Sequence, residues 1–393
     1  MANGLSWATN LSKIMFVMSA NTLAEETSLL DQAIDRLSVE LGPGVTVERS
    51  NRVVPGLAPD KAQRVNDLID IRAENGFTAT LAVEARRSVT PRDAERMLLG
   101  QVDMLARLAN VRFLVVAPWL SPRTRELLAS RGVNYVDLTG NTLFRLDNPT
   151  IRIRTDGAAR DPAPAMRGLA RLRGPKAGRL VRVLADAAPP YGVRELATKA
   201  TLTPGYVSRL LDALDRESLV DRDQRGRVTA VDIPRLLRRY AEYYDTLTTN
   251  DRSLFIARTG AAQAAARLGE LTAPTAITGS FAAQRLNPVA APSLLAVYCT
   301  DVTATARALD LLPADEGANV ALLRPFDPVV WDRTVSEGGL TYVSPTQVAL
   351  DCLAGNGRMP AEGEAVLTWL AANESAWRAP ALADIPPFGV GAT

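Results

Sequence analysis

The chain has 393 residues, which is enough for two or three domains with separate hydrophobic cores. It carries 45 Lys and Arg against 43 Asp and Glu, has no histidine, and contains no apolar run long enough to span a bilayer. Because histidine is absent, the commonest general base and zinc ligand are missing, and Ser-His and Cys-His nucleophile pairs are excluded. We therefore expect a cytoplasmic protein that is not an enzyme and needs no cofactor, with Cys299 and Cys352 as buried thiols.

Residues 1–155 alternate between helical and extended patterns. The expected elements are a helix over 22–41, an extended segment over 45–54, a hairpin of 66–72 and 77–86, a helix from Thr90 to about Leu108, a strand over 111–117, a helix over 122–130, a strand over 133–138 and two extended pieces within 142–154. The hairpin is indicated most strongly, because Glu74-Asn75-Gly76 is a good turn sequence. This order predicts a mixed sheet flanked by helices.

The same order resembles the restriction-endonuclease-like fold. In that fold one strand carries a carboxylate and the next carries Glu-x-Lys, which together hold a metal ion and activate water. Asp70 and the triplet Glu84-Ala85-Arg86 occupy the corresponding places, with Gln101 on the following helix. Arginine stays protonated and cannot replace the lysine, so the resemblance implies an inactive domain. In the alternative, a metal-dependent nuclease or repair factor, Asp70 and Glu84 are the catalytic candidates.

Residues 156–175 are rich in Ala, Pro, Gly and Arg, which predicts a basic linker whose arginines either follow a DNA backbone or form a solvated tether. Residues 176–232 have the pattern of a winged helix-turn-helix. We expect helices over 176–185 and 193–200, then a third helix with Thr203 as N-cap and Pro204 in its first position. Two short strands within 219–229 would form the wing.

The third helix has one apolar face, formed by Val207, Leu210, Leu211 and Leu214. Its other face carries polar residues near the N-terminal half, where a recognition helix reaches base edges. The DNA-binding candidates are Thr203, Tyr206, Ser208 and Arg209 in this helix, Arg222, Arg225 and Arg227 in the wing, and Lys176, Arg194 and Lys199 as phosphate partners. Charge supports this assignment, because residues 152–239 hold nineteen Lys and Arg but ten Asp and Glu. The alternative is a winged helix used only for dimerisation or packing.

Residues 233–393 are predicted to form a connecting helix over 233–246 and a second α/β domain. Ala276 to Ala283 has the pattern of a strand, a glycine turn and a helix start, and Ser293 to Cys299 that of a buried strand. This resembles a minimal nucleotidyltransferase, in which Gly-Ser cradles phosphate and paired carboxylates on the next strand bind magnesium. Here that strand has no acidic residue, so the resemblance implies an inactive domain without a metal site. Gly279 and Ser280 remain candidates for binding a small-molecule or nucleotide effector.

Further motifs are spread over most of the chain. They are Val115–Leu128, Tyr135–Asn141, Pro189–Ala197, Val207–Leu214, Thr278–Ser280, Pro325–Val329 and Thr341–Val348. With these motifs the chain resembles actinobacterial helix-turn-helix regulators grouped with AbiEi-type antitoxins of type IV toxin-antitoxin systems. The resemblance implies a sequence-specific regulator of transcription that binds double-stranded DNA, and we expect a homodimer. An antitoxin that neutralises a protein toxin is a further alternative.

The expected fold class is thus α/β multidomain. It combines a restriction-endonuclease-like domain over 1–155, the linker over 156–175, the winged helix-turn-helix over 176–232, and a degenerate nucleotidyltransferase-like domain over 233–393. The flanking domains would supply dimerisation, further DNA contacts or effector sensing.

Overall fold

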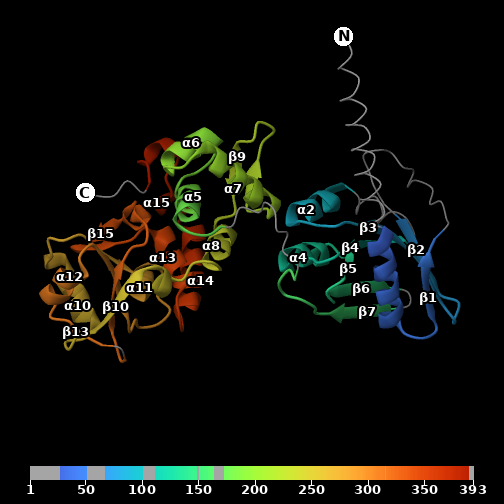
Figure 1. Ribbon diagram of the computed structural model, residues 1–393, viewed down its shortest axis with the longest axis horizontal. Coiled ribbons are helices and arrows are strands. Elements are labelled where there is room, and N and C mark those ends of the chain that lie inside the picture. The colour runs from blue at the N-terminus through green and yellow to red at the C-terminus, as the bar shows by residue number, and fades with distance from the viewer. Residues whose placement is uncertain are drawn as a thin grey trace, which may run out of the picture. The chain divides into compact units, whose positions relative to one another are not determined.

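The computed structural model describes residues 27–50, 67–100, 111–147, 150–162, 172–314 and 316–388. It divides the chain into two compact units, Met1–Met166 and Arg167–Thr393, each of which is described by itself. Both units mix helices with β-sheet, as expected from the sequence (Figure 1). No helix within the described ranges is both long enough and apolar enough to cross a membrane.

The first unit is built on a seven-stranded sheet whose strands lie side by side in chain order. The strands are β1 (Val45–Arg49), β2 (Asp67–Ala73), β3 (Thr78–Ala85), β4 (Val111–Ala117), β5 (Asn134–Asp137), β6 (Thr142–Asp147) and β7 (Thr150–Thr155). The β3–β4 and β4–β5 pairs are parallel and the other pairs are antiparallel. The predicted hairpin of β2 and β3 is confirmed, and Gly76 in its turn has a φ of 85°, which glycine adopts most easily.

Helices cover both faces of this sheet. A helix over 27–41 packs its buried leucines on one face, while α2 (Pro91–Gly100) and α4 (Pro122–Ser130) pack on the other. The bounds of β4 and α4 are those predicted from the sequence. Of the predicted elements of this unit, residues 22–26, 51–54, 66, 101–108 and 148–149 lie outside the described residues, as do residues 163–171 of the predicted linker.

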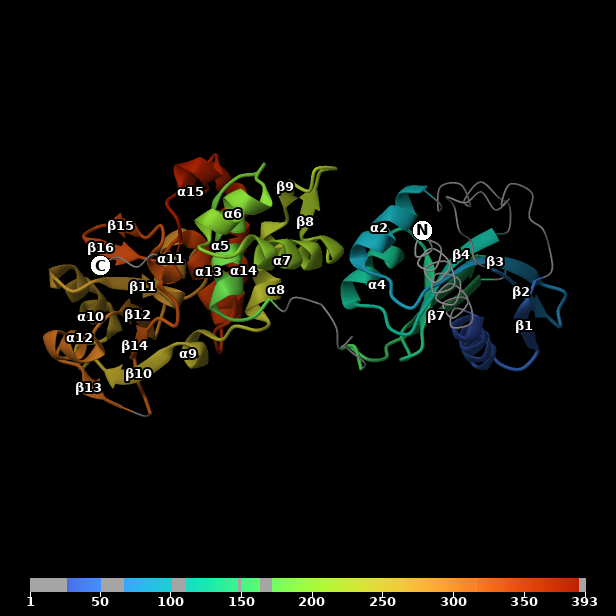
Figure 2. The same cartoon turned by 45° about the horizontal axis from the view of Figure 1, so that its top comes forward.

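The second unit begins with three helices and a two-stranded antiparallel hairpin. These elements are α5 (Pro175–Asp186), α6 (Val193–Lys199), α7 (Pro204–Arg216), β8 (Val220–Arg222) and β9 (Val228–Val231). Figure 2 shows α7 beside the hairpin. The element order is the one predicted for residues 176–232.

The predicted helix over 233–246 is shorter in the structure. It is replaced by α8 (Ile233–Ala241) and the single turn α9 (Thr246–Thr249). The break occurs at Asp245, whose backbone is extended. Its carboxylate accepts hydrogen bonds from the amides of Leu247 at 3.0 Å and Thr248 at 2.7 Å, and this N-cap starts a new helix. The prediction of one continuous helix was therefore wrong at its C-terminal end.

A second seven-stranded sheet follows, in the order β13-β10-β14-β12-β11-β16-β15. Its strands are β10 (Asp251–Ile256), β11 (Thr275–Thr278), β12 (Leu295–Cys299), β13 (Leu312–Pro313), β14 (Val320–Arg324), β15 (Val335–Glu337) and β16 (Leu340–Tyr342). The helices of this region are α10 (Ala261–Arg267), α11 (Gly279–Leu286), α12 (Val302–Ala308), α13 (Pro345–Leu353), α14 (Met359–Ala372) and α15 (Glu374–Trp377), with short 3-10 turns η1 (Leu268–Glu270), η2 (Pro328–Trp331) and η3 (Leu382–Asp384).

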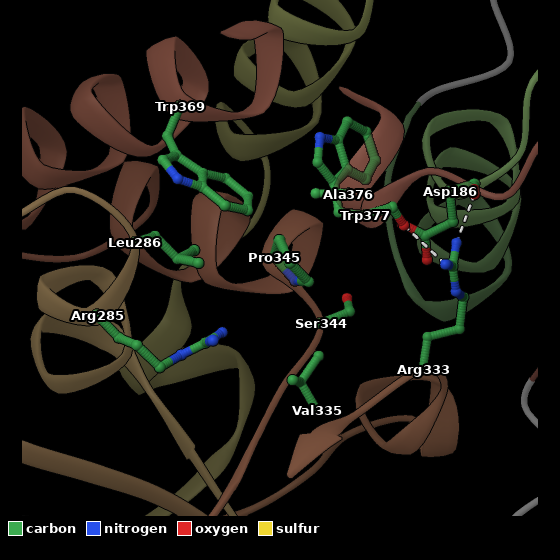
Figure 3. A pocket seen from close by; sticks show the side chains of 10 residues that line it. All are labelled: Asp186, Arg285, Leu286, Arg333, Val335, Ser344, Pro345, Trp369, Ala376 and Trp377. Carbon is green, nitrogen blue, oxygen red and sulfur yellow. Dashed lines mark hydrogen bonds between the residues drawn. The ribbon is translucent and has the colours of Figure 1, made fainter. Parts of the chain in front are cut away.

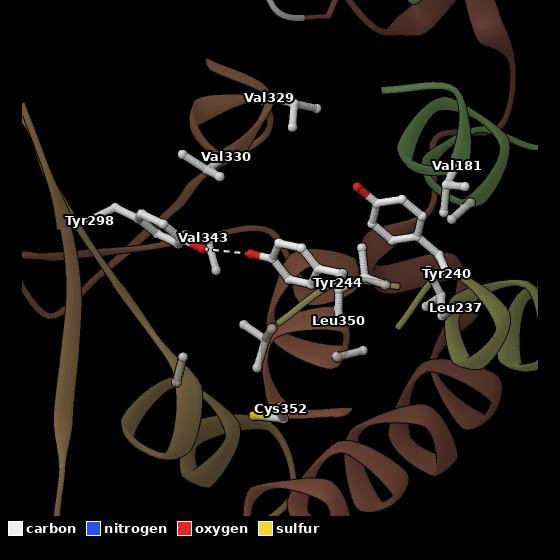
Figure 4. Packing of buried hydrophobic residues seen from close by; sticks show 14 of the residues in the cluster. Val181, Leu237, Tyr240, Tyr244, Tyr298, Val329, Val330, Val343, Leu350 and Cys352 are labelled. Carbon is white, nitrogen blue, oxygen red and sulfur yellow. Dashed lines mark hydrogen bonds between the residues drawn. The ribbon is translucent and has the colours of Figure 1, made fainter. Parts of the chain in front are cut away.

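One hydrophobic core joins the three-helix segment to this second sheet. Val181 on α5, Tyr240 on α8, Val329 in η2 and Leu350 on α13 all belong to it (Figure 4). Inside the same core the buried guanidinium of Arg182 donates hydrogen bonds to partners on three segments: the carboxylate of Asp186, the side-chain oxygen of Gln347 and the carbonyl of Val329. Helix α5 is therefore part of the α/β packing.

The two cysteines are free and buried, which confirms the sequence-based expectation. Burial raises the pKa of the Cys299 thiol to about 11, so this thiol stays protonated at neutral pH.

Candidate nucleic-acid interface

The helix-turn-helix pattern is formed by α6, a short turn and α7. Helix α6 begins after Gly192, whose amide donates a hydrogen bond to the Glu195 carboxylate at 2.5 Å. It ends before Thr201, whose φ of 55° is left-handed and stops the helix. Thr203 occupies the N-cap of α7 with Pro204 in the first turn, as predicted. The two helices contact each other, so α6 supports α7.

One face of α7 is buried and the other is accessible. The buried face consists of the predicted residues Val207, Leu210, Leu211 and Leu214. On the accessible face, Thr203, Gly205 and Arg209 are exposed. Tyr206 and Ser208 are half-buried beside them. Burial raises the pKa of the Tyr206 hydroxyl, although the positive charge of Arg209 opposes this shift. The N-terminal half of α7 thus presents a cation beside neutral hydrogen-bonding groups.

The three arginines of the β8–β9 hairpin have different surroundings. Arg222 donates from Nη1 to the Asp212 carboxylate on α7 at 2.6 Å and from Nε to a carbonyl of the hairpin turn at 3.1 Å. Arg227 has its Nη2 at 4.0 Å from the Glu195 carboxylate, the limit for an ion pair. Arg225 is exposed and has no ion pair within the described residues. Arg222 therefore ties the hairpin to the helix, and Arg225 is the more accessible cation.

The three candidate phosphate partners also differ in their exposure and in their contacts. Lys176 and Arg194 are exposed, and within the described parts of the chain neither has an ion pair. The Lys199 ammonium instead donates a hydrogen bond to the Ile385 carbonyl. Phe388 donates its amide hydrogen to the carbonyl of the same lysine, at 2.5 Å. The structure thus directs Lys199 to the C-terminal segment of the unit.

The positive charge surplus counted from the sequence is partly neutralised by internal ion pairs. On α5, Arg179 lies 2.9 Å from Asp327 and the buried Arg182 lies 3.0 Å from Asp186. All three arginines of α8 are paired as well: Arg235 with Asp232, Arg238 with Glu364, and Arg239 with Glu217. Within residues 175–239, the exposed cations that have no ion pair to a described residue lie on α5, on α6, on α7 and in the hairpin turn.

The Gly279-Ser280 turn at the start of α11 is filled by the protein itself. Gly279 has a φ of 62°, and a Cβ added to it would lie 3.2 Å from the Met359 side chain. The Ser280 hydroxyl donates a hydrogen bond to the Glu362 carboxylate at 2.5 Å, and both side chains are buried. Within the described ranges there is no group of three or more His, Cys, Asp or Glu that could hold a metal ion. Neither residue lines the cavity beside Leu286 and Trp369 that the structure shows in this unit.

A buried carboxylate that sequence reasoning missed lies next to this turn. Asp351 accepts hydrogen bonds from the hydroxyls of Thr278 at 2.5 Å, Tyr244 at 2.8 Å and Tyr298 at 3.1 Å, and from the Gln347 amide at 2.9 Å. Burial raises the pKa of its carboxyl group. The sequence does carry a signal, a single acidic residue within an apolar helix. Because its oxygens are enclosed and satisfied, we interpret Asp351 as a structural residue.

The two nuclease candidates of the first unit are not brought together. Asp70 on β2 lies opposite Thr80 on β3, four residues before Glu84, which corresponds to roughly 13 Å along the strand. The Asp70 carboxylate accepts hydrogen bonds from the hydroxyls of Ser50 and Thr80, each at 2.8 Å. The Glu84 carboxylate is buried and pairs with Arg86 at 2.5 Å. This arrangement gives no shared metal site for the two carboxylates.

Residues 227–368 match the family described as "Transcriptional regulator, AbiEi antitoxin, Type IV TA system". The matched segment runs from the end of the β8–β9 hairpin through most of α14 and leaves out α6 and α7. Over this segment, the match supports the AbiEi-type family expected from the sequence motifs. No curated protein and no solved structure matches the chain.

Proposed function

We propose that this AbiEi-type protein binds double-stranded DNA sequence-specifically through residues 176–232, which act as a winged helix-turn-helix, and thereby regulates transcription. Helix α7 is the recognition helix and the β8–β9 hairpin is the wing. The observation that carries the proposal is the accessible N-terminal half of α7, where Arg209 is exposed and has no ion pair within the described residues. The family description, a transcriptional regulator, supports it independently.

The chemistry of α7 suits a DNA groove. Thr203 makes no side-chain capping bond, so its hydroxyl is available, and the positive end of the helix dipole favours a phosphate there. Arg209 lies six residues further, roughly 9 Å along the helix axis. This distance allows Thr203 to contact the DNA backbone while Arg209 contacts a base. A guanidinium there can make a bidentate contact with guanine, and Ser208 beside it can contact phosphate or a base edge.

The hairpin and the supporting residues take different parts in this proposal. Arg225 contacts phosphate or the minor groove, because its side chain is exposed. Arg222 positions the hairpin through its ion pair with Asp212. Lys176 and Arg194 contact phosphate, while Lys199 holds the C-terminal segment against α6.

We also propose that the flanking α/β regions, restriction-endonuclease-like and nucleotidyltransferase-like in plan, have no catalytic role and supply dimerisation, DNA contacts or effector sensing. A homodimer would place two copies of α7 on successive half-sites. The family description also names antitoxins, so a protein toxin is the alternative partner.

The first experiment is capture and sequencing of fragments from the source genome with the full-length protein, followed by affinity measurements on the enriched site. Arg209→Ala should weaken binding by about 1 to 3 kcal/mol and relax the preference for one base pair. Arg216→Ala is the matched control, because this exposed arginine lies on the same helix roughly 10 Å further from its N-terminus.

A discrete site that is lost with Arg209→Ala and kept with Arg216→Ala supports the proposal. Equal binding to all sequences, or equal effects of the two substitutions, contradicts α7 as the reading helix. Failure to bind any DNA, combined with rescue of growth when the protein is produced with a toxin encoded beside it, would favour the antitoxin function.

A further inference from the structure

A cavity of about 150 Å³ lies in the second unit, between helices α11, α13, α14 and α15 and the β15 strand (Figure 3). Its apolar lining includes Leu286, Pro345, Trp369 and Trp377. Cationic side chains complete it, because Arg285 and Arg333 line it as well. The cavity thus combines aromatic walls with two guanidinium groups, and nothing in the DNA-binding function uses it.

Arg285 has unused hydrogen-bonding capacity. Its Nη1 donates to the Glu337 carboxylate at 2.6 Å, and its guanidinium lies over the Tyr342 ring, 4.8 Å from the ring centroid. Its Nε and Nη2 are buried and have no hydrogen-bond partner within the described residues. Buried donors without acceptors cost free energy, so an acceptor placed against this guanidinium would be stabilised. In Figure 3 the guanidinium points toward Ser344 and Val335 across the cavity.

Arg333 has a guanidinium whose charge is not balanced by a carboxylate. It donates to two backbone carbonyls, from Nη1 to Asp186 at 2.5 Å and from Nη2 to Trp377 at 2.7 Å. The Asp186 carboxylate is already engaged by Arg182 and Thr346. Within the described part of the chain, Arg333 therefore has neutral hydrogen-bond acceptors but no ion pair. An anion in the cavity would meet an uncompensated positive charge.

We propose that this cavity binds a small aromatic carboxylate, with its ring between the indoles and Leu286 and its carboxylate between Arg285 and Arg333, which lie at opposite ends of the cavity in Figure 3. Size selects the ligand class, because an apolar cavity of about 150 Å³ accommodates a single benzene ring. A nucleotide exceeds this volume. Inorganic phosphate fits but leaves the indoles unused, whereas an aromatic acid satisfies both the apolar walls and the guanidinium donors.

A ligand in this cavity should affect the helix-turn-helix, because hydrogen bonds connect the two. The Asp186 carbonyl that Arg333 contacts ends α5, and it also accepts the amide hydrogen of Ala379 at 2.9 Å. Ala188, in the segment leading to α6, donates its amide hydrogen to the Ala379 carbonyl at 2.8 Å. A carboxylate that draws Arg333 away from Asp186 loosens this junction, so the ligand should weaken DNA binding. This regulatory step rests on the proposed DNA-binding function.

The test is titration of the full-length protein with benzoate, followed by calorimetry and by tryptophan fluorescence, since two of the five tryptophans line the cavity. Benzamide, which has the same shape without the charge, should bind at least about tenfold more weakly. Inorganic phosphate should leave the fluorescence unchanged. Equal binding of benzoate and benzamide, or no saturable binding of benzoate, overturns the proposal.

Substitutions locate the site. Arg285→Met, which keeps an apolar side chain but removes the guanidinium, should weaken benzoate binding at least about tenfold. Val335→Phe, which fills the cavity and leaves both arginines in place, should abolish benzoate binding. This second variant tests the site even if Arg285→Met fails to fold. Arg324→Met is the matched control, because Arg324 is exposed and belongs to the same unit but does not line the cavity. Wild-type binding by both cavity variants would refute the site.

DNA affinity is then measured with and without saturating benzoate. A decrease of at least about threefold that is absent in Val335→Phe supports coupling. Unchanged DNA affinity with benzoate bound overturns the regulatory step while the binding site stands. Because the benzoate titration needs no DNA, the site is tested even if the proposed DNA binding fails.

Discussion

The two units each bury an acidic residue completely, and the two residues are held in opposite ways. In the first unit Asp137 accepts hydrogen bonds from the amides of Leu120, Thr139 and Asn141 and from the side chains of the latter two. Most of these donors lie within four residues of it. In the second unit the donors to Asp351 are side chains from 4 to 107 residues away.

This difference teaches what each carboxylate does. Asp137 organises one loop, because most of its donors, backbone amides and side chains alike, lie within four residues of it. Asp351 joins elements that are distant in sequence, because its partners come from the segment after α8, from β11, from β12 and from α13 itself. A buried carboxylate can thus fix a turn in one unit and hold a whole core together in another.

Removal of the Asp351 carboxylate should have the largest effect. Asp351→Ala leaves the donors of Tyr244, Thr278, Tyr298 and Gln347 without their acceptor inside the core, and we expect a loss of about 3 to 5 kcal/mol in the stability of the second unit. Urea unfolding followed by hydrogen exchange of each unit measures it. Increased exchange confined to α13 would contradict a role that spans several elements.

Asp137→Ala should have a smaller and more local effect. The substitution leaves the amides of Leu120, Thr139 and Asn141 unsatisfied, but water can reach the half-exposed Thr139, so we expect a loss of about 2 to 3 kcal/mol in the first unit. Hydrogen exchange should rise mainly over residues 117–125 and 137–142. If exchange rises equally across all seven strands, Asp137 holds its whole unit together as Asp351 does, and the proposed difference between the two carboxylates is wrong.

A pH titration tests the role of Asp351 further, and its expected effect on stability is the smallest of the three. Because burial raises the pKa of Asp351, the folded state holds its proton to higher pH than the unfolded state does. The stability of the wild type relative to Asp351→Asn should therefore be greatest below about pH 3.9 and fall as the pH rises toward the raised pKa. Urea midpoints at several pH values between 3.5 and 7 measure this difference. The chain has no histidine to titrate in that range, and a difference that rises with pH would contradict the sign.

Local patterns predicted most of the elements that the structure describes. The buried strand β4, helix α4 and the apolar face of α7 follow from periodicity and turn residues alone. The end of α8 could not be predicted in this way, because Tyr244 continues the apolar spacing of the helix although the backbone has already left it. Asp245 decides the break by capping α9, a local competition that periodicity does not register.

The candidate site was less accessible to sequence reasoning. The exposure of Arg209 follows from helical spacing, but the engagement of Lys199 by Ile385 depends on a contact 186 residues away. Charge counting could not distinguish Arg225, which is exposed, from Arg238, which is paired with Glu364. The cavity depends on several distant segments, so no spacing rule could have assembled it.

Arg182 has a consequence for the growing chain on the ribosome. Its buried guanidinium depends on Gln347, which is synthesised 165 residues later. At about 5 to 20 residues per second, that interval lasts roughly 8 to 33 s. Until Val329 and Asp332 are made, Asp186 is the one of these partners that is present, and α5 has no finished core to enter. Helix α5 therefore emerges long before it can complete its packing, and assembly of the second unit should be governed by the arrival of α13.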